Sequence, residues 1–309
     1  MKNLDEGSIS MSLIKKSVIA ALFMSLSLSS YAGNGNSGNG NSGNGISACQ
    51  VIDVKVTTIQ LLNGSAVTTL PVPKNSTDCL GAYEGNNSSF EKPTANLGYD
   101  NDGWLNKEDY NDWWDGPGAF VDEADLLDLD GDGQTDDPGW VYVSESNNAG
   151  KMIGQTSTDG NSSYTFIDDL ITFSDCKDKS GNSSQCIGGE AVSGTWEYTP
   201  PAQNPDELIN LLGGSFFDQV AIVFKAANAF AIYNFSVADL GLDPALAGDY
   251  NYAFTGTWDI SDVLADKGLS NVTFWARDPI NPVAVPEPSS IVLLLLSGVL
   301  LFSRNKLKK

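Results

Sequence analysis

Residues 220–235 read VAIVFKAANAFAIYNF. Two runs of β-branched and aromatic residues, 220–224 and 229–235, flank a short polar and small-residue segment, a pattern typical of a β-hairpin. Similar runs recur along the chain between stretches of Gly, Pro, Asn and Ser, at 52–61, 140–143, 164–173, 194–198, 252–258 and 272–276. Short helices are expected at 205–212 and 262–267, each ahead of a glycine. The sequence therefore predicts a mainly β body, an antiparallel β-sandwich or jelly-roll-like single domain.

Charge and composition exclude several function classes. The 309 residues include 17 basic and 39 acidic side chains, for a net charge of −22, and no histidine. Such a negative chain repels phosphate backbones, so nucleic acid is not expected as a partner. Without histidine the chain has no Ser-His-Asp or Cys-His nucleophile system and no imidazole ligand for catalytic zinc. Much hydrolase chemistry is thereby excluded.

The N-terminus has the pattern of a secretory signal peptide. Two lysines precede the apolar run 17–28, and Ser30-Tyr31-Ala32 supplies small residues for a cut ahead of Gly33. Because acidic residues precede Met11, Met11 is the expected true start. The prediction is export by the Sec machinery and removal of the signal peptide by signal peptidase.

The C-terminus combines a short motif with an apolar run and a basic end. Pro286-Glu287-Pro288 precedes the apolar run 291–302, after which come one arginine and three lysines. Twelve such residues are fewer than the ~20 that span a bilayer comfortably, but the basic end favours a membrane-inserted helix with its C-terminus in the cytoplasm. The predicted parts of the chain are a helical signal peptide at 1–32, a flexible leader GNGNSGNGNSGNG at 33–45, the β body at 46–283 with an acidic loop at 100–137, and a sorting signal at 285–309 with a transmembrane segment at 289–303.

This C-terminal order resembles the PEP-CTERM sorting signal of Gram-negative bacteria. The resemblance implies that an exosortase recognises Pro286, Glu287 and Pro288 and removes the tail, so that the membrane anchor is transient. It also implies a location at the cell surface or outside the cell, in an exopolysaccharide or biofilm matrix. A plain C-terminal anchor is the alternative interpretation.

Four cysteines occur in a chain that is expected to leave the cytoplasm. An oxidising compartment favours two disulfides, and three pairings are possible. We predict Cys49 with Cys79 and Cys176 with Cys186, because this choice closes the shorter loops in sequence. Free buried thiols are the alternative.

The acidic loop carries the densest chemistry of the chain. Fourteen carboxylates lie between Asp100 and Asp137, where Lys107 is the single cation. Within this loop, oxygen ligands at positions one, three, five, seven and nine, with glycine at position six, predict a calcium-stabilised loop. The pattern resembles the loops of EF-hands, dockerins and thrombospondin type 3 repeats, although Gly139 stands at position twelve, where those loops have a bidentate glutamate. Asp137 or Glu123 would have to complete the coordination shell. An unliganded, solvated turn is the alternative interpretation. The candidate ligands of Ca²⁺ are Asp128, Asp130, Asp132, the backbone carbonyl of Gln134, and Asp136.

The seven tryptophans are divided by their surroundings in the sequence. Those inside strand patterns are expected in the core, and these are Trp140, Trp196, Trp258 and Trp275. Trp104, Trp113 and Trp114 lie in the polar acidic loop and are candidate glycan contacts, because a flat indole covers the apolar face of a sugar ring.

Three functions are compatible with these features. The first is a non-enzymatic matrix protein, stabilised by calcium and able to bind exopolysaccharide. The second is a secreted glycan-cleaving enzyme, which needs only two carboxylates; Glu197 with Glu145 or Glu190 would be the nominees. The third is a purely structural or adhesive surface protein. We expect the first, and therefore no enzymatic activity.

Overall fold

The hairpin predicted at 220–235 is formed by strands β10 (Gln219–Ala226) and β11 (Ala229–Ser236), which pair antiparallel. The computed structural model of the chain describes residues 46–64, 66–86, 103–126, 128, 133–147, 150–154, 156–158, 163–165, 168–200, 217–242 and 251–277.

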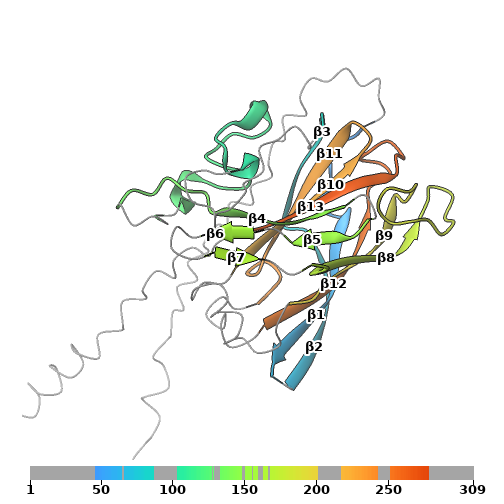
Figure 1. Cartoon of the computed structure of the whole chain (residues 1–309), viewed down its shortest axis with the longest axis horizontal. Helices are drawn as coiled ribbons and strands as arrows, with labels where there is room; N and C mark the ends of the chain where they lie inside the picture. The colour runs from blue at the N-terminus through green and yellow to red at the C-terminus, as the bar shows by residue number, and fades with distance from the viewer. Residues whose placement is uncertain are drawn as a thin grey trace, which may run out of the picture. The chain divides into compact units, whose positions relative to one another are not determined.

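Two antiparallel sheets make up most of the body (Figure 1). The five-stranded sheet has the order β2-β1-β12-β9-β8, from β2 (Ala66–Asn75), β1 (Val54–Asn63), β12 (Asn251–Asp259), β9 (Ser193–Tyr198) and β8 (Ile171–Lys177). The six-stranded sheet has the order β3-β11-β10-β13-β4-β5, where the further strands are β3 (Asp78–Glu84), β13 (Leu269–Arg277), β4 (Trp140–Ser146) and β5 (Met152–Gly154). A separate small hairpin joins β6 (Thr156–Thr158) to β7 (Ser163–Thr165). The predicted mainly β, two-sheet fold is confirmed, whereas the jelly-roll topology and the two terminal helices stay predictions.

The predicted helix over 262–267 is wrong. The chain there forms turns around an isolated bridge between Ile46 and Leu264. Ala265 and Asp266 have φ values of 57° and 56°, which lie in the left-handed region and cannot continue a right-handed helix. The helix predicted at 205–212 lies outside the described residues.

The six-stranded sheet is buried on both of its faces. On β10, Ile222 and Phe224 contact the core between the two sheets, whereas Ala221 and Val223 belong to a second apolar cluster on the opposite face. The same alternation occurs on β11, β13 and β4. Successive strand residues point to opposite faces, so continuous apolar runs of this kind require cover on both sides.

Two disulfides join the pairs that the sequence predicted. Cys49 bonds to Cys79 at the start of β3, and Cys176 at the end of β8 bonds to Cys186. No free cysteine remains. The first disulfide fixes the segment before β1 to the edge of the six-stranded sheet, and the second closes a ten-residue loop beside the five-stranded sheet.

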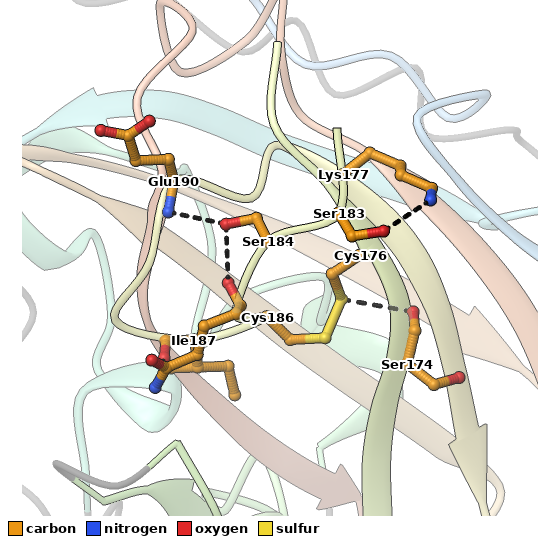
Figure 2. The surroundings of a disulfide bond; sticks show 9 residues. Ser174, Cys176, Lys177, Ser183, Ser184, Cys186, Ile187 and Glu190 are labelled. Atoms are coloured by element: carbon orange, nitrogen blue, oxygen red, sulfur yellow. Dashed lines mark hydrogen bonds between the residues drawn. A yellow bond between two sulfur atoms is a disulfide. The ribbon is translucent and has the colours of Figure 1, made fainter. Parts of the chain in front are cut away.

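Hydrogen bonds hold the loop that Cys176 and Cys186 close (Figure 2). The Ser184 hydroxyl accepts from the backbone N–H of Glu190 at 3.1 Å. The Lys177 Nζ donates to the Ser183 hydroxyl at 3.2 Å. These contacts connect the loop to the strand before it and to the segment after it.

Candidate functional site

The described part of the acidic loop forms a structured cover on the six-stranded sheet. We call residues 103–126 the cover; it contains three short 3-10 helices, η3 (Trp104–Asn106), η4 (Tyr110–Asp112) and η5 (Glu123–Asp125). Its apolar side chains form one buried cluster with β3, β4, β10, β11 and β13. The members from the cover are Trp104, Leu105, Trp114, Ala119 and Val121. The cover therefore buries the face of the six-stranded sheet that is opposite the core between the two sheets.

Trp104 and Trp114 lie in this core and not on a binding surface. They are only 2% and 7% exposed, so neither offers a free ring face to a sugar. The Trp104 ring packs edge-on against Trp275, with 6.0 Å between ring centroids. The polar surroundings in the sequence suggested exposure, but the sheet face beneath the cover supplies an apolar partner. The tryptophans expected in the core, Trp140, Trp196, Trp258 and Trp275, are all buried as predicted.

Trp113 differs from the other two candidate glycan contacts. Its ring is only partly buried, stacks on Tyr83 at 5.2 Å and meets Phe230 edge-on at 4.9 Å. The Tyr83 hydroxyl donates a hydrogen bond to the Trp113 carbonyl, which fixes the backbone at the same place. Glycan contact by Trp113 stays a prediction.

A buried asparagine docks the cover onto β4. The Asn106 Nδ2 donates to the Trp140 carbonyl at 2.8 Å, and the Trp140 N–H donates to Asn106 Oδ1 at 2.7 Å. The indole Nε1 of Trp140 donates to the Ala119 carbonyl at 2.7 Å. The amide of Asn106 thus replaces a neighbouring strand and satisfies backbone groups that would otherwise be buried without partners.

Arg277 at the end of β13 is a cation at the base of the acidic loop that the sequence analysis did not identify. Its guanidinium is buried, and its Nε donates to the Pro138 carbonyl at 2.7 Å while an Nη donates to the Asp125 carbonyl. Burial lowers the pKa of Arg277, and the charges of Asp218, Asp125 and Asp137 oppose this shift. The one signal in the sequence was an arginine directly after an apolar strand. Arg277 therefore binds both ends of the segment that contains the predicted calcium loop.

The predicted calcium loop is described in part. Asp128, Gln134 and Asp136 are described, whereas Asp130 and Asp132 lie outside the described residues. Gly133, at position six, has φ 87°, and its N–H donates to Asp128 Oδ2 at 3.1 Å. Among the described residues no group of three or more acidic or cysteine side chains is close enough together to hold a metal ion.

A small cavity lies where the cover meets β3. It measures about 50 Å³ and is lined by Asp78, Leu80 and, from the cover, mainly Trp114, Asp115 and Asp122. Desolvation, with a smaller contribution from the charge of Asp239, raises the pKa of Asp78 to about 6. The sequence offered no sign that Asp78 would lie at this junction.

The three carboxylates nominated for glycan cleavage lie on separate elements. Glu197 is exposed on β9 of the five-stranded sheet, and Glu145 is on β4 of the six-stranded sheet. Glu190 lies in the chain that follows the Cys176–Cys186 loop. Glycan cleavage by these residues stays the alternative to the predicted non-enzymatic function.

Comparisons with known proteins leave the function to be inferred from this chain alone. No protein-family model, no curated protein and no solved structure matches it. The signal peptide, the leader and the sorting signal with Pro286, Glu287 and Pro288 lie outside the described residues. Within the described ranges no helix is long and apolar enough to cross a membrane.

Proposed function

We propose that this chain is an exported, non-enzymatic protein of the cell surface or extracellular matrix, delivered through removable signals at both ends. The observation that carries the proposal is the pair of disulfides, Cys49–Cys79 and Cys176–Cys186, in a chain with an export-type N-terminus. Disulfides persist in oxidising compartments and are rare in the cytoplasm. Signal peptidase and an exosortase would be the processing partners, and exopolysaccharide the surrounding polymer.

Calcium is the proposed stabiliser of the acidic loop. The donors are of the right chemistry, since Asp128, Asp130, Asp132 and Asp136 offer carboxylate oxygens and Gln134 a backbone carbonyl. Support comes from Gly133, whose left-handed backbone and hydrogen bond to Asp128 suit the tight turn of such a loop. A bound Ca²⁺ would offset the mutual repulsion of these carboxylates. It would keep the loop closed between the Asp125 and Pro138 carbonyls, to which Arg277 donates hydrogen bonds.

The location is tested by cell fractionation of the host that carries the gene. Replacing Pro286, Glu287 and Pro288 by alanine should retain the protein in the membrane fraction with its C-terminal tail attached, whereas the unchanged chain reaches the surface or the medium without it. The matched control replaces Pro279 and Pro282, two prolines just upstream, and should be sorted normally. Normal sorting of the motif variant would contradict the proposal.

A further inference from the structure

The outer face of the five-stranded sheet carries an open groove of about 370 Å³. Its walls come from β1, β12, β9 and β8, which are neighbours in the sheet. The volume lies within the range of about 300–1,000 Å³ that is usual for small-ligand sites. No part of the proposed delivery or of the calcium loop uses this face.

Polar side chains line the groove in rows that follow the register of the strands. Lys55 on β1 pairs with Thr257 on β12, and Thr257 pairs with Thr195 on β9. One step along, Asp259 pairs with Ser193. The residues between them in sequence point into the core, so the hydroxyl, amine and carboxylate groups point outward together.

Fixed negative charge surrounds these hydroxyl groups. Asp53, Asp175 and Asp259 line the groove, and Lys55 is the one cation among its lining residues. The Asp53 Oδ2 accepts from the Tyr233 hydroxyl at 2.9 Å and from the Gln50 N–H at 2.7 Å. The Asp259 Oδ1 accepts from the Ser261 hydroxyl at 2.6 Å. Two of the three carboxylates are therefore held in place before any ligand arrives.

We propose that this groove binds an oligosaccharide that carries free amino groups. The hydroxyl groups of Thr195, Thr257 and Ser193 can each donate to and accept from sugar hydroxyls. The surplus of carboxylates matches the positive charge of protonated amino groups. The groove would be the surface through which the proposed matrix protein contacts exopolysaccharide, so its biological meaning rests on the proposed function.

An extended peptide fits this groove less well than a sugar chain. A peptide strand gains most of its affinity from main-chain hydrogen bonds at a free sheet edge. The floor of the groove consists mainly of strand pairs β1–β12 and β12–β9, whose backbone groups already bond to one another. The neighbouring pair β9–β8 has a register shift between Ser174 and Lys177, next to Asp175. Side-chain contacts remain available there, and these suit a polyhydroxylated ligand.

The test measures binding by isothermal titration calorimetry with the mature protein purified from its host. The probes are the hexamer of glucosamine, the hexamer of N-acetylglucosamine, and spermine as a cation without a sugar ring. The variant Asp175→Asn removes an exposed charge from the groove, and Thr257→Val removes an exposed hydroxyl group. The matched control is Asp266→Asn, because Asp266 is also exposed, has φ 56° against 51° for Asp175, and does not line the groove.

We expect the glucosamine hexamer to bind and the acetylated hexamer to bind at least about tenfold more weakly, since acetylation removes the charge. Each groove variant should weaken binding by about two- to fivefold, as for the loss of one exposed polar contact, and Asp266→Asn should leave it unchanged. The proposal would be overturned if spermine bound as tightly as the glucosamine hexamer, if both groove variants bound as tightly as the unchanged protein, or if the glucosamine hexamer did not bind. A correctly sorted protein that does not bind contradicts this inference alone, whereas a failure of sorting contradicts the proposed function.

Discussion

Gly256 on β12 lies directly opposite Trp196 on β9, and the Trp196 indole occupies the space that a side chain at Gly256 would need. The indole Nε1 passes over the glycine and donates to the Lys55 carbonyl on β1 at 3.1 Å. The relationship is reciprocal, because Trp258 lies opposite Gly194 in the same strand pair. Two Gly-Thr-Trp segments thus pair antiparallel, and each glycine makes room for the other strand's tryptophan.

Replacing Gly256 by alanine should destabilise the fold strongly. An added Cβ would lie 2.1 Å from the Lys55 carbonyl oxygen and 2.3 Å from Trp196 Nε1, so both the backbone and the indole would have to move. Overpacking of this kind costs about 1–3 kcal/mol or more. The free energy of unfolding is measured by urea denaturation, with Thr257→Ala at the exposed neighbouring position as the control. A loss no greater than that of the control would contradict the packing described.

The strands show which parts of the fold sequence patterns can predict. The hairpin at 220–235 was predicted because its turn and its two apolar runs are adjacent in sequence. β2 was missed because Pro71 and Pro73 interrupt the strand pattern. Within the described part of the chain β2 pairs with β1 alone and is an edge strand, where proline is tolerated. The helix expected at 262–267 does not form because Ala265 and Asp266 adopt left-handed backbone conformations, which the residue types there do not indicate.

Loss of Arg277 should release the cover from the sheet. Arg277→Met removes the donors to the Pro138 and Asp125 carbonyls and leaves Asp137 and Asp218 without the buried charge that faces them. Leaving buried carbonyls without their charged donor costs about 1–3 kcal/mol for each group. We expect faster proteolytic cleavage within 103–126 and a red shift of tryptophan fluorescence, because the buried indoles of the cover become solvated.

The control for this substitution is Lys179→Met, which removes an exposed cation within the loop that Cys176 and Cys186 close. It should change neither the cleavage pattern nor the fluorescence. Equal behaviour of the two variants would mean that Arg277 does not hold the cover.

Asp78 should make the stability depend on pH between about 4 and 6. Its pKa rises from 3.8 to about 6, chiefly through desolvation, so the folded state favours the protonated carboxyl. The contribution is fully present below pH 3.8 and is lost as the pH rises through about 6. Asp78→Asn cannot ionise and should therefore exceed the unchanged protein in stability at pH 7, by about 1–2 kcal/mol after allowing for partial exposure.

Thermal unfolding of both proteins from pH 3.5 to pH 7.5 checks this prediction. The difference between them should vanish at the acidic end and grow toward neutral pH. A difference that is constant across the range would show that Asp78 does not titrate as described.

Calcium should stabilise the fold through the loop that begins at Asp128. A ligand held only by the folded state raises the free energy of unfolding, by about 2.7 kcal/mol at a hundredfold excess over Kd. The variants Asp128→Ala and Asp132→Ala should abolish the calcium-dependent rise in unfolding temperature, while Asp266→Asn should retain it. No response to millimolar calcium would make the loop a solvated turn.

The cover shows why the candidate site was predicted only in part. The acidic loop was found by its composition, but Trp104 and Trp114 were placed at the surface because their neighbours in sequence are polar. The ring partners Trp275 and Phe230 of Trp104 lie more than a hundred residues away along the chain, and Trp114 belongs to the same buried cluster. The continuous apolar pattern of β10 and β11 carried the missing information, since a strand without polar alternation needs cover on both faces.

The most direct test of the proposed delivery is the intact mass of the protein recovered from the cell surface or medium, before and after reduction. We expect a chain that begins at Gly33, lacks the apolar tail beyond Pro288, and on reduction gains the mass that two disulfides account for. A chain found in the cytoplasm with its tail intact and four reduced cysteines would contradict it.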